Sequence, residues 1–298
     1  MLFRSVTPEA VESGKELIEK KITGIHLKKD ITEKLYIEAV GISQGNQARV
    51  IISREHNRFS LVELNGKVLM SLINDELKEN QTETAELSFD KVCEFALETP
   101  LSEISFILET VRLNKAAAEA SLKGTYGHSV AQTLANGMMG NSVYTHMLSV
   151  TAAACDARMG GAMFPVMSNS GSGNQGIAAT LPVSVFAEES GKTEEQLIRA
   201  LVLSHLMTIY IKQSLGRLSG LCGAVVAATG SSCGVAYLMG GTKEQIGYAI
   251  KNMIGNITGM ICDGAKPSCT LKVSNGVSTA TLDRKSTRLN SSHDQISY

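Results

Sequence analysis

The chain has 298 residues, 43% of them hydrophobic, and a formal net charge of −1. This composition excludes an intrinsically disordered chain, and the balanced charge argues against a nucleic-acid or membrane partner. Six cysteines are too few for a disulfide scaffold in a chain of this length, so we expect a reducing cytoplasm. The N-terminal residues carry no apolar run typical of a signal peptide.

Residues 1–86 carry the signals of a small α/β region. Thr7 followed by Pro8 predicts a helix start, because threonine is a favoured N-cap and proline suits the first helical position. β-rich runs follow at 35–40, 48–52, 59–62 and 68–70. Turn residues separate these runs, at Gly45–Asn46 and at Asn65–Gly66, and the latter is a hairpin signal. We therefore predict an α+β protein whose N-terminal region holds a small antiparallel sheet and a flanking helix.

Residues 87–283 show a helical pattern. Thr193 with Gln196 and Thr242 with Gln245 match the capping box that opens many helices. Two stretches without charge, 159–187 and 218–242, are interrupted by Gly, Ser, Asn or Pro, which favours buried helices over membrane spans. We predict a mainly α-helical domain with buried apolar central helices.

The last residues, 284–298, are polar and aperiodic. They are similar to translated sequencing-adapter sequence, so we predict a non-native tail and give it no role in the fold.

Three cysteines form the first candidate site. Cys222, Cys262 and Cys269 lie in glycine-rich segments with little charge, and a Gly/Pro-bearing loop separates the last two. Soft thiolates that converge on a turn are what an iron–sulfur cluster or a zinc ion requires. No C-x2-C or His-x3–5-His pattern accompanies them. Cys233 is a competing ligand. It follows Cys222 by eleven residues, about three helical turns, so the two cysteines would lie on a similar face of a helix.

The second candidate site is the Gly/Ser/Asn loop at 168–176. Its glycines allow a ligand to approach the backbone, and the helix expected at 177–187, interrupted at Pro182, would direct amide groups at a carboxylate or phosphate. A tight turn with an N-cap explains the same residues. Upstream, Arg158 either pairs with a substrate carboxylate or with Asp156. The loop does not match a nucleotide-binding motif.

Three motifs together, at 155–161, 168–176 and 260–269, resemble the bacterial L-cysteine desulfidase family, which is related to the iron–sulfur L-serine dehydratases. The resemblance covers nearly all of residues 1–283. It implies a [4Fe–4S] cluster on Cys222, Cys262 and Cys269, with one iron open to substrate. It also implies that the Gly/Ser/Asn loop holds the amino acid. The expected substrate-binding residues are Ser170, Gly171, Ser172, Asn174 and Arg158.

The resemblance implies α,β-elimination of a small L-amino acid, with L-cysteine converted to pyruvate, ammonia and hydrogen sulfide. L-serine dehydration is the alternative within the family. Two further alternatives lie outside it. A pyridoxal-phosphate lyase would use Lys212, Lys251 or Lys266, and a non-catalytic protein would use zinc on the three cysteines and Cys233 as a staple.

One family feature is missing from this sequence. Full-length members carry a Gly-Cys-Thr-Glu-Pro motif whose cysteine is thought to act as the base, and no such motif occurs here. We therefore predict no catalytic residue and expect a fragment whose N-terminal part is absent. The expected partner is a small amino-acid substrate, with neither nucleic acid nor membrane, and exposed apolar surface would favour a homo-oligomer.

Overall fold

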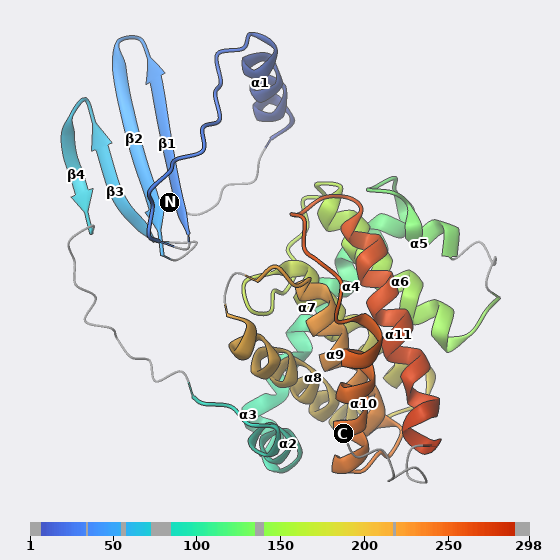
Figure 1. Cartoon of the computed structure of the whole chain (residues 1–298). Helices are drawn as coiled ribbons and strands as arrows, with labels where there is room; N and C mark the ends of the chain where they lie inside the picture. Colours follow the sequence, from blue (N-terminus) through green and yellow to red (C-terminus); the bar gives the residue numbers. More distant parts are fainter. Residues whose placement is uncertain are drawn as a thin grey trace. The chain divides into compact units, whose positions relative to one another are not determined.

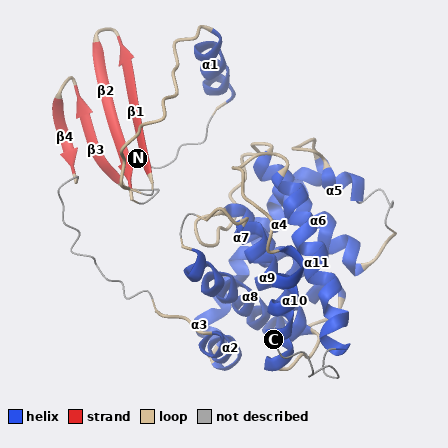
Figure 2. Cartoon of the chain, in the orientation of Figure 1, coloured by secondary structure: helices blue, strands red, loops and turns tan. Residues whose placement is uncertain are grey.

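The computed structural model describes residues 7–33, 35–54, 58–72, 85–134, 140–216 and 219–289, with side chains through Thr281. The chain divides into two compact units, Met1–Glu86 and Leu87–Tyr298. The first unit contains the described strands and one helix, and the second is helical (Figure 2). The predicted α+β class is confirmed.

The first unit is built on a four-stranded antiparallel sheet in the order β1-β2-β3-β4 (Figure 1). Its elements are α1 (Pro8–Glu19), β1 (Tyr36–Ser43), β2 (Asn46–Ser53), β3 (Phe59–Leu64) and β4 (Lys67–Ser71). The Thr7 hydroxyl caps α1 by accepting from the Ala10 N–H at 3.2 Å, as predicted. The Asn65–Gly66 hairpin is also confirmed, since both residues have the positive φ of a type I′ turn. The first turn lies one residue earlier than predicted, at Gln44–Gly45, where both φ values are positive.

The second unit is a helical bundle. Its elements are α2 (Phe89–Glu98), α3 (Leu101–Ile104), η1 (Ser105–Ile107), α4 (Leu108–Lys123), α5 (Val130–Thr133), α6 (Val143–Met159), α7 (Gly173–Glu189), α8 (Glu194–Leu215), α9 (Gly223–Leu238), α10 (Lys243–Ile257) and α11 (Cys269–Leu289). Both predicted capping boxes are present, at the starts of α8 and α10. Helix α11 continues past residue 283, and residues 290–298 of the proposed non-native tail lie outside the described part.

Helix α9 is the centre of the bundle, packed against α7, α8, α10 and α11 (Figure 1). Small residues allow these close approaches. A Cβ added at Gly230 would lie 2.4 Å from the Ser204 carbonyl oxygen of α8. A Cβ added at Gly276 of α11 would lie 2.9 Å from the Ala228 side chain of α9. The predicted buried apolar helices are thus confirmed, and none of the described helices combines the length and hydropathy that crossing a bilayer requires.

Helix α7 differs from the sequence prediction at its start. It begins at Gly173 rather than at residue 177, and it continues through Pro182 without interruption. Burial explains the second difference, because every residue from Gly173 to Ala187 is buried and packing outweighs the hydrogen bond that proline forfeits. The earlier start places Asn174 in the first helical turn.

Candidate functional site

A two-residue turn presents Ser170 and Gly171. Asn169 and Ser172 close the turn through reciprocal backbone hydrogen bonds of 3.1 and 3.0 Å. Ser170 has φ of 49° and Gly171 of 81°, the pair of positive values that a type I′ turn requires. Serine pays a steric cost in this left-handed conformation, so the surrounding contacts hold the tip in place. The tight-turn interpretation of this loop is therefore correct.

The N-terminus of α7 has features of an anion site. The Ser172 hydroxyl, at the N-cap, makes no capping hydrogen bond, so it leaves the first amides of the helix to other acceptors. Arg158, in the last turn of α6, lies against this end: a Cβ added at Gly173 would be 2.4 Å from its Nε. A cation at the positive end of a helix dipole is unfavourable unless an anion lies between them. The Asn174 Nδ2 contacts the Met159 Sδ at 3.5 Å, while its buried Oδ1 has no hydrogen-bond partner among the described residues, so this oxygen can accept from a donor beside the anion.

Among the described residues, no ion pair joins Arg158 to Asp156. The buried Asp156 carboxylate instead accepts from the His128 and Ala131 N–H groups, both at 3.3 Å. It thereby fixes the loop that carries His128, while the His128 side chain is exposed. Pairing with Asp156, the structural alternative for Arg158, is therefore wrong, and no other described residue forms an ion pair with its guanidinium.

Gln175 connects this terminus to Cys222. A Cβ added at Gly223 would lie 2.7 Å from the Gln175 Cδ, so the Gln175 side chain rests on the first residue of α9. Cys222 is the N-cap of that helix. The Gln175 Oε1 is buried and, like the Oδ1 of Asn174, lacks a hydrogen-bond partner in the described part of the chain. The loop motif and the first cysteine, 47 positions apart in sequence, are thus neighbours in the fold.

Cys222 and Cys262 are joined through a short antiparallel bridge between Leu221 and Ile261. The Cys222 N–H donates to the Met260 carbonyl at 2.9 Å, and the Cys262 N–H donates to the Gly220 carbonyl at 2.8 Å. Since side chains alternate along paired strands, the two cysteines occupy the same face of the bridge at diagonal positions. Cys222 is buried and Cys262 is exposed.

Cys269 begins α11, and a charged clamp ties that helix to the bridge. Lys272, one turn into α11, donates to the Ile261 carbonyl at 2.9 Å and pairs with Asp263. Lys266 pairs with the other oxygen of Asp263. These two ammonium groups lower the pKa of Asp263. The hydrogen bond to Asp263 raises the pKa of Lys272. Lys272 thus ties the start of α11 to the residues on either side of Cys262.

A buried hydrogen-bond chain behind the turn runs through His205. The Asn169 Nδ2 donates to the His205 Nδ1 and to the His205 carbonyl, both at 3.1 Å. The His205 Nε2 lies 2.9 Å from the Thr180 Oγ1, which donates to the Gly176 carbonyl at 2.7 Å. The Thr180 oxygen must therefore accept from Nε2, which assigns the neutral Nε2–H tautomer. Burial lowers the pKa of His205 to about 4, in agreement with this assignment.

Comparison with known sequences supports one family. A sequence model described as the serine dehydratase alpha chain matches residues 12–296. The chain belongs to the serine dehydratase alpha-chain family. A UPF0597 protein of Bacteroides fragilis is 61% identical over 285 residues, covering 94% of this chain and 67% of that protein. A UPF0597 protein of Clostridium perfringens is 41% identical over 285 residues, covering 94% of this chain and 66% of that protein. The chain thus spans about two thirds of the length of these relatives.

The structure leaves the predicted cysteine ligand set untested. Among the described residues, no three His, Cys, Asp or Glu side chains form a group that could hold a metal ion. Cys222 and Cys262 lie on one face of the bridge, and Cys269 begins a helix that Lys272 ties to that bridge.

Cys233 does not join this set. It lies in the second half of α9, so eleven residues of helix place it about 16 Å along the axis from Cys222. It is fully buried and its Sγ contacts the Thr229 carbonyl at 3.3 Å. Burial raises the pKa of Cys233, and raises that of Cys155 to about 12. Cys93 and Cys155 are likewise buried.

The sequence analysis overlooked several residues of the site. Gln175 belongs to the quoted motif but carried no role, and Asn169 is visible only as the partner of His205. His205 is a hydrogen-bonded core residue, and its contact with the turn exists only in the folded chain. Thr270, directly after Cys269, is fully buried with an unpartnered hydroxyl in the described part of the chain. The only feature of the sequence that could have pointed to Thr270 is its position beside the predicted ligand Cys269.

Proposed function

We propose that this chain carries the cluster-binding and substrate-holding part of a lyase that eliminates the β-substituent of a small L-amino acid. Our preferred reaction is L-cysteine to pyruvate, ammonia and hydrogen sulfide. The observation that carries the proposal is the α7 terminus, where Arg158 lies against the uncapped first turn and Gln175 of that turn contacts Gly223, the residue after Cys222. A carboxylate there would satisfy a cation, a helix dipole and backbone donors together.

Each group has a defined role in this proposal. Arg158 and the α7 amides bind the substrate carboxylate, and the turn at Ser170, Gly171 and Ser172 covers it. The Asn174 and Gln175 oxygens can accept from the substrate ammonium group, because both lack partners among the described residues. Cys222, Cys262 and Cys269 would hold a [4Fe–4S] cluster, whose open iron supplies a Lewis acid for the β-leaving group.

We assign no described residue as the base that removes the α-proton. His205 is unsuitable because both ring nitrogens are hydrogen-bonded and burial lowers its pKa to about 4. The His128 side chain is exposed, on the loop that the Asp156 carboxylate anchors.

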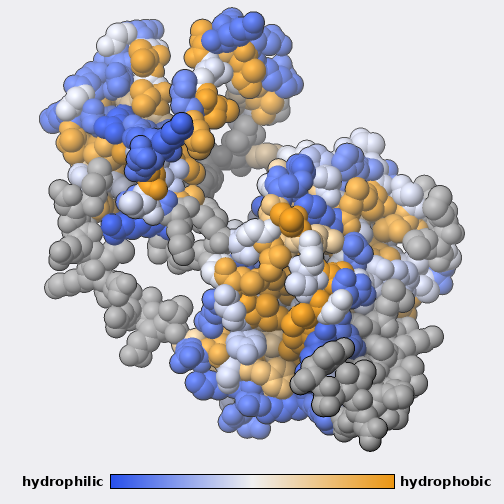
Figure 3. Space-filling view, viewed as in Figure 1, coloured by the Kyte–Doolittle hydropathy of each residue, from blue (hydrophilic) through white to orange (hydrophobic). Residues whose placement is uncertain are grey.

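L-serine dehydration is the second candidate, and the description of the matching family favours it. The zinc-staple alternative loses support, because Cys233 is remote from the other cysteines. We also propose a cytoplasmic location, since all six cysteines are free thiols. Self-association remains a proposal: exposed apolar side chains adjoin the site at Phe164, Ile261 and Leu271, and Figure 3 shows apolar surface on the helical unit.

The test compares two matched pairs of substitutions after anaerobic reconstitution of the full chain. We expect about four irons and four acid-labile sulfides per wild-type chain. Cys222→Ala with Cys262→Ala should abolish iron binding, whereas Cys93→Ala with Cys233→Ala should preserve it, because those thiols are buried elsewhere. Stoichiometric zinc without sulfide, or equal iron in both double variants, would refute the cluster assignment.

Substrate binding is tested separately by equilibrium dialysis of labelled L-cysteine and L-serine. Arg158→Gln should weaken binding of either amino acid by about tenfold or more, since it removes a charge-assisted contact. Arg112→Gln is the control, because Arg112 is an exposed arginine paired with Glu109 on α4. Preference between the two amino acids decides between the two candidate reactions. Unchanged binding by Arg158→Gln would contradict the placement of the carboxylate.

A further inference from the structure

The sheet unit contains a cavity of about 300 Å³ at one end of its strands. Its walls come from β1, β2 and the segments that precede β1 and follow β2 and β4. Three arginines and one glutamate supply the charged groups: Arg49, Arg54, Arg58 and Glu33. A volume of this size lies at the lower end of the range for small-molecule sites. None of the motifs assigned to the proposed lyase function involves this cavity.

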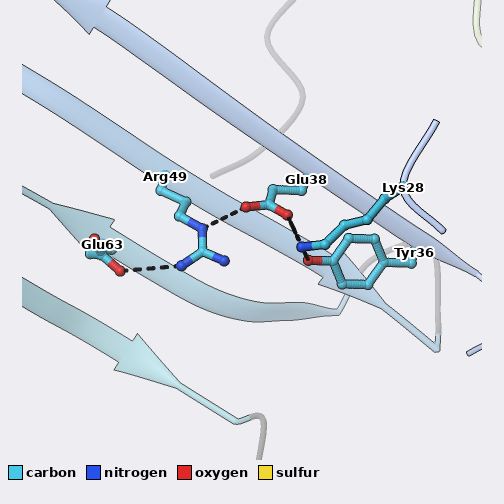
Figure 4. Close-up of polar contacts among 5 residues, drawn as sticks. All are labelled: Lys28, Tyr36, Glu38, Arg49 and Glu63. Atoms are coloured by element: carbon cyan, nitrogen blue, oxygen red, sulfur yellow. Dashed lines mark hydrogen bonds and ion pairs between the residues drawn. The ribbon is translucent and has the colours of Figure 1, made fainter. Parts of the chain in front are cut away.

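Arg49 is already neutralised by the sheet. It donates to Glu38 at 2.6 Å and lies 3.7 Å from Glu63, and Figure 4 shows it between these two carboxylates. Glu38 also accepts from Lys28 and Tyr36. These contacts lower the pKa of Glu38 to about 2, with the Lys28 hydrogen bond as the largest cause. This network therefore fixes one wall of the cavity, and the charge of Arg49 in that wall is balanced by the two carboxylates.

Arg54 and Arg58 are not balanced in this way. The Arg58 Nη2 donates to the Leu72 carbonyl at 3.1 Å, but its Nη1 is buried and has no hydrogen-bond partner within the described ranges. Arg54 has no acidic partner among the same residues, and its backbone adopts a left-handed φ of 69°, which is unusual outside glycine. A buried guanidinium nitrogen without an acceptor is costly, so an arrangement that keeps one indicates a missing acceptor.

We propose that this cavity binds a small oxyanion, a carboxylate or phosphate group, between the Arg54 and Arg58 guanidinium groups. The planar fork of arginine donors matches the oxygen spacing of both groups. The Tyr36 and Ser53 side chains line the same cavity, next to the charged groups. Glu33 also lines the cavity, and its negative charge repels an anion and keeps the affinity of the site modest. The site lies wholly within the sheet unit, so it is independent of the proposed lyase chemistry.

The test is isothermal titration calorimetry of the full chain with sodium phosphate and with sodium succinate, against sodium chloride at equal ionic strength. We expect saturable binding of at least one oxyanion with a dissociation constant on the order of 1 mM or tighter. The tighter of the two identifies the natural group as phosphate or carboxylate. Saturation by neither would overturn the proposal.

Variants separate a specific site from a loss of folding. Arg54→Gln removes an exposed cation and should weaken binding about tenfold, and Arg58→Lys should do the same because lysine keeps the charge without the fork. Glu33→Gln should tighten binding, an effect that partial unfolding cannot imitate. Arg112→Gln, on α4 of the other unit, should leave binding unchanged. Equal affinity in wild type, Arg54→Gln and Glu33→Gln would refute the site.

Discussion

Gly176 offers the sharpest test of how the α7 terminus is built. A Cβ at this position would lie 1.8 Å from the Met167 carbonyl oxygen and 2.9 Å from the Ser168 Cα. Both obstacles are backbone atoms, so no side-chain rotation can relieve them. The Asn114 carboxamide also clamps this junction, donating to the Gly176 carbonyl at 3.3 Å and accepting from the Met167 N–H at 3.0 Å.

The expected cost of Gly176→Ala follows from these contacts. Overpacking costs roughly 1–3 kcal/mol, and disturbing the two Asn114 hydrogen bonds adds about 1 kcal/mol each. Alanine recovers only about 0.5–1 kcal/mol of helix propensity. The net loss of roughly 2–4 kcal/mol should lower the Tm of the helical unit by roughly 5–15 °C, since 1 kcal/mol shifts the Tm of such a unit by about 2–4 °C.

Gly255→Ala is the matched control. Gly255 also lies inside a helix, α10, but a Cβ there meets nothing within 4 Å. We expect its Tm to rise by about 1–4 °C, because only the propensity gain applies. Thermal unfolding followed by far-UV circular dichroism measures both. A Gly176→Ala variant as stable as Gly255→Ala would show that the loop does not pack on α7 as described.

Two further predictions concern the groups around the site. His205 has a folded-state pKa of about 4, below its ordinary 6.5, so between these values the unfolded chain binds a proton that the folded chain does not. Stability should therefore fall as the pH is lowered from 7 to 5, by about 2 kcal/mol from this group. His205→Gln should remove that part of the pH dependence in urea titrations, and an unchanged profile would contradict the buried neutral imidazole. Asp263→Asn removes the shared partner of Lys266 and Lys272. It should speed the loss of iron from reconstituted protein under a chelator, relative to Asp90→Asn on α2, and equal rates would refute the clamp.

The sequence predicted local features well where neighbouring residues decide them. The Thr193 and Thr242 capping boxes, the Asn65–Gly66 turn and the Thr7 cap all depend on contacts within four residues. Periodicity could not place the start of α7, because Gly173, Asn174 and Gly176 are poor helix formers. Their helical conformation comes from burial against α6 and α9.

The candidate site also combines features that the sequence predicts with features that only the fold reveals. Composition identified the thiols and the Gly/Ser/Asn loop, but their proximity depends on Gln175 resting on Gly223. The separation of Cys233 from Cys222 depends on α9 being one continuous helix between them, because each helical residue then advances about 1.5 Å along the axis. The unpartnered Asn174 and Gln175 oxygens are visible only once every neighbour is placed.

The bridge between Leu221 and Ile261 has a consequence for the resistance of the helical unit to opening. It brings together positions about 40 residues apart, and α9 and α10 form the intervening loop. A ligand bound by Cys222 and Cys262 together would close that loop as a cross-link does, which is worth roughly 4 kcal/mol in the chain-entropy model. Amide hydrogen exchange in α9 and α10 would then slow when the thiols are loaded. The occupancy of the two thiols would thus be recorded in the exchange rates along the whole of α9 and α10, which lie between them in sequence.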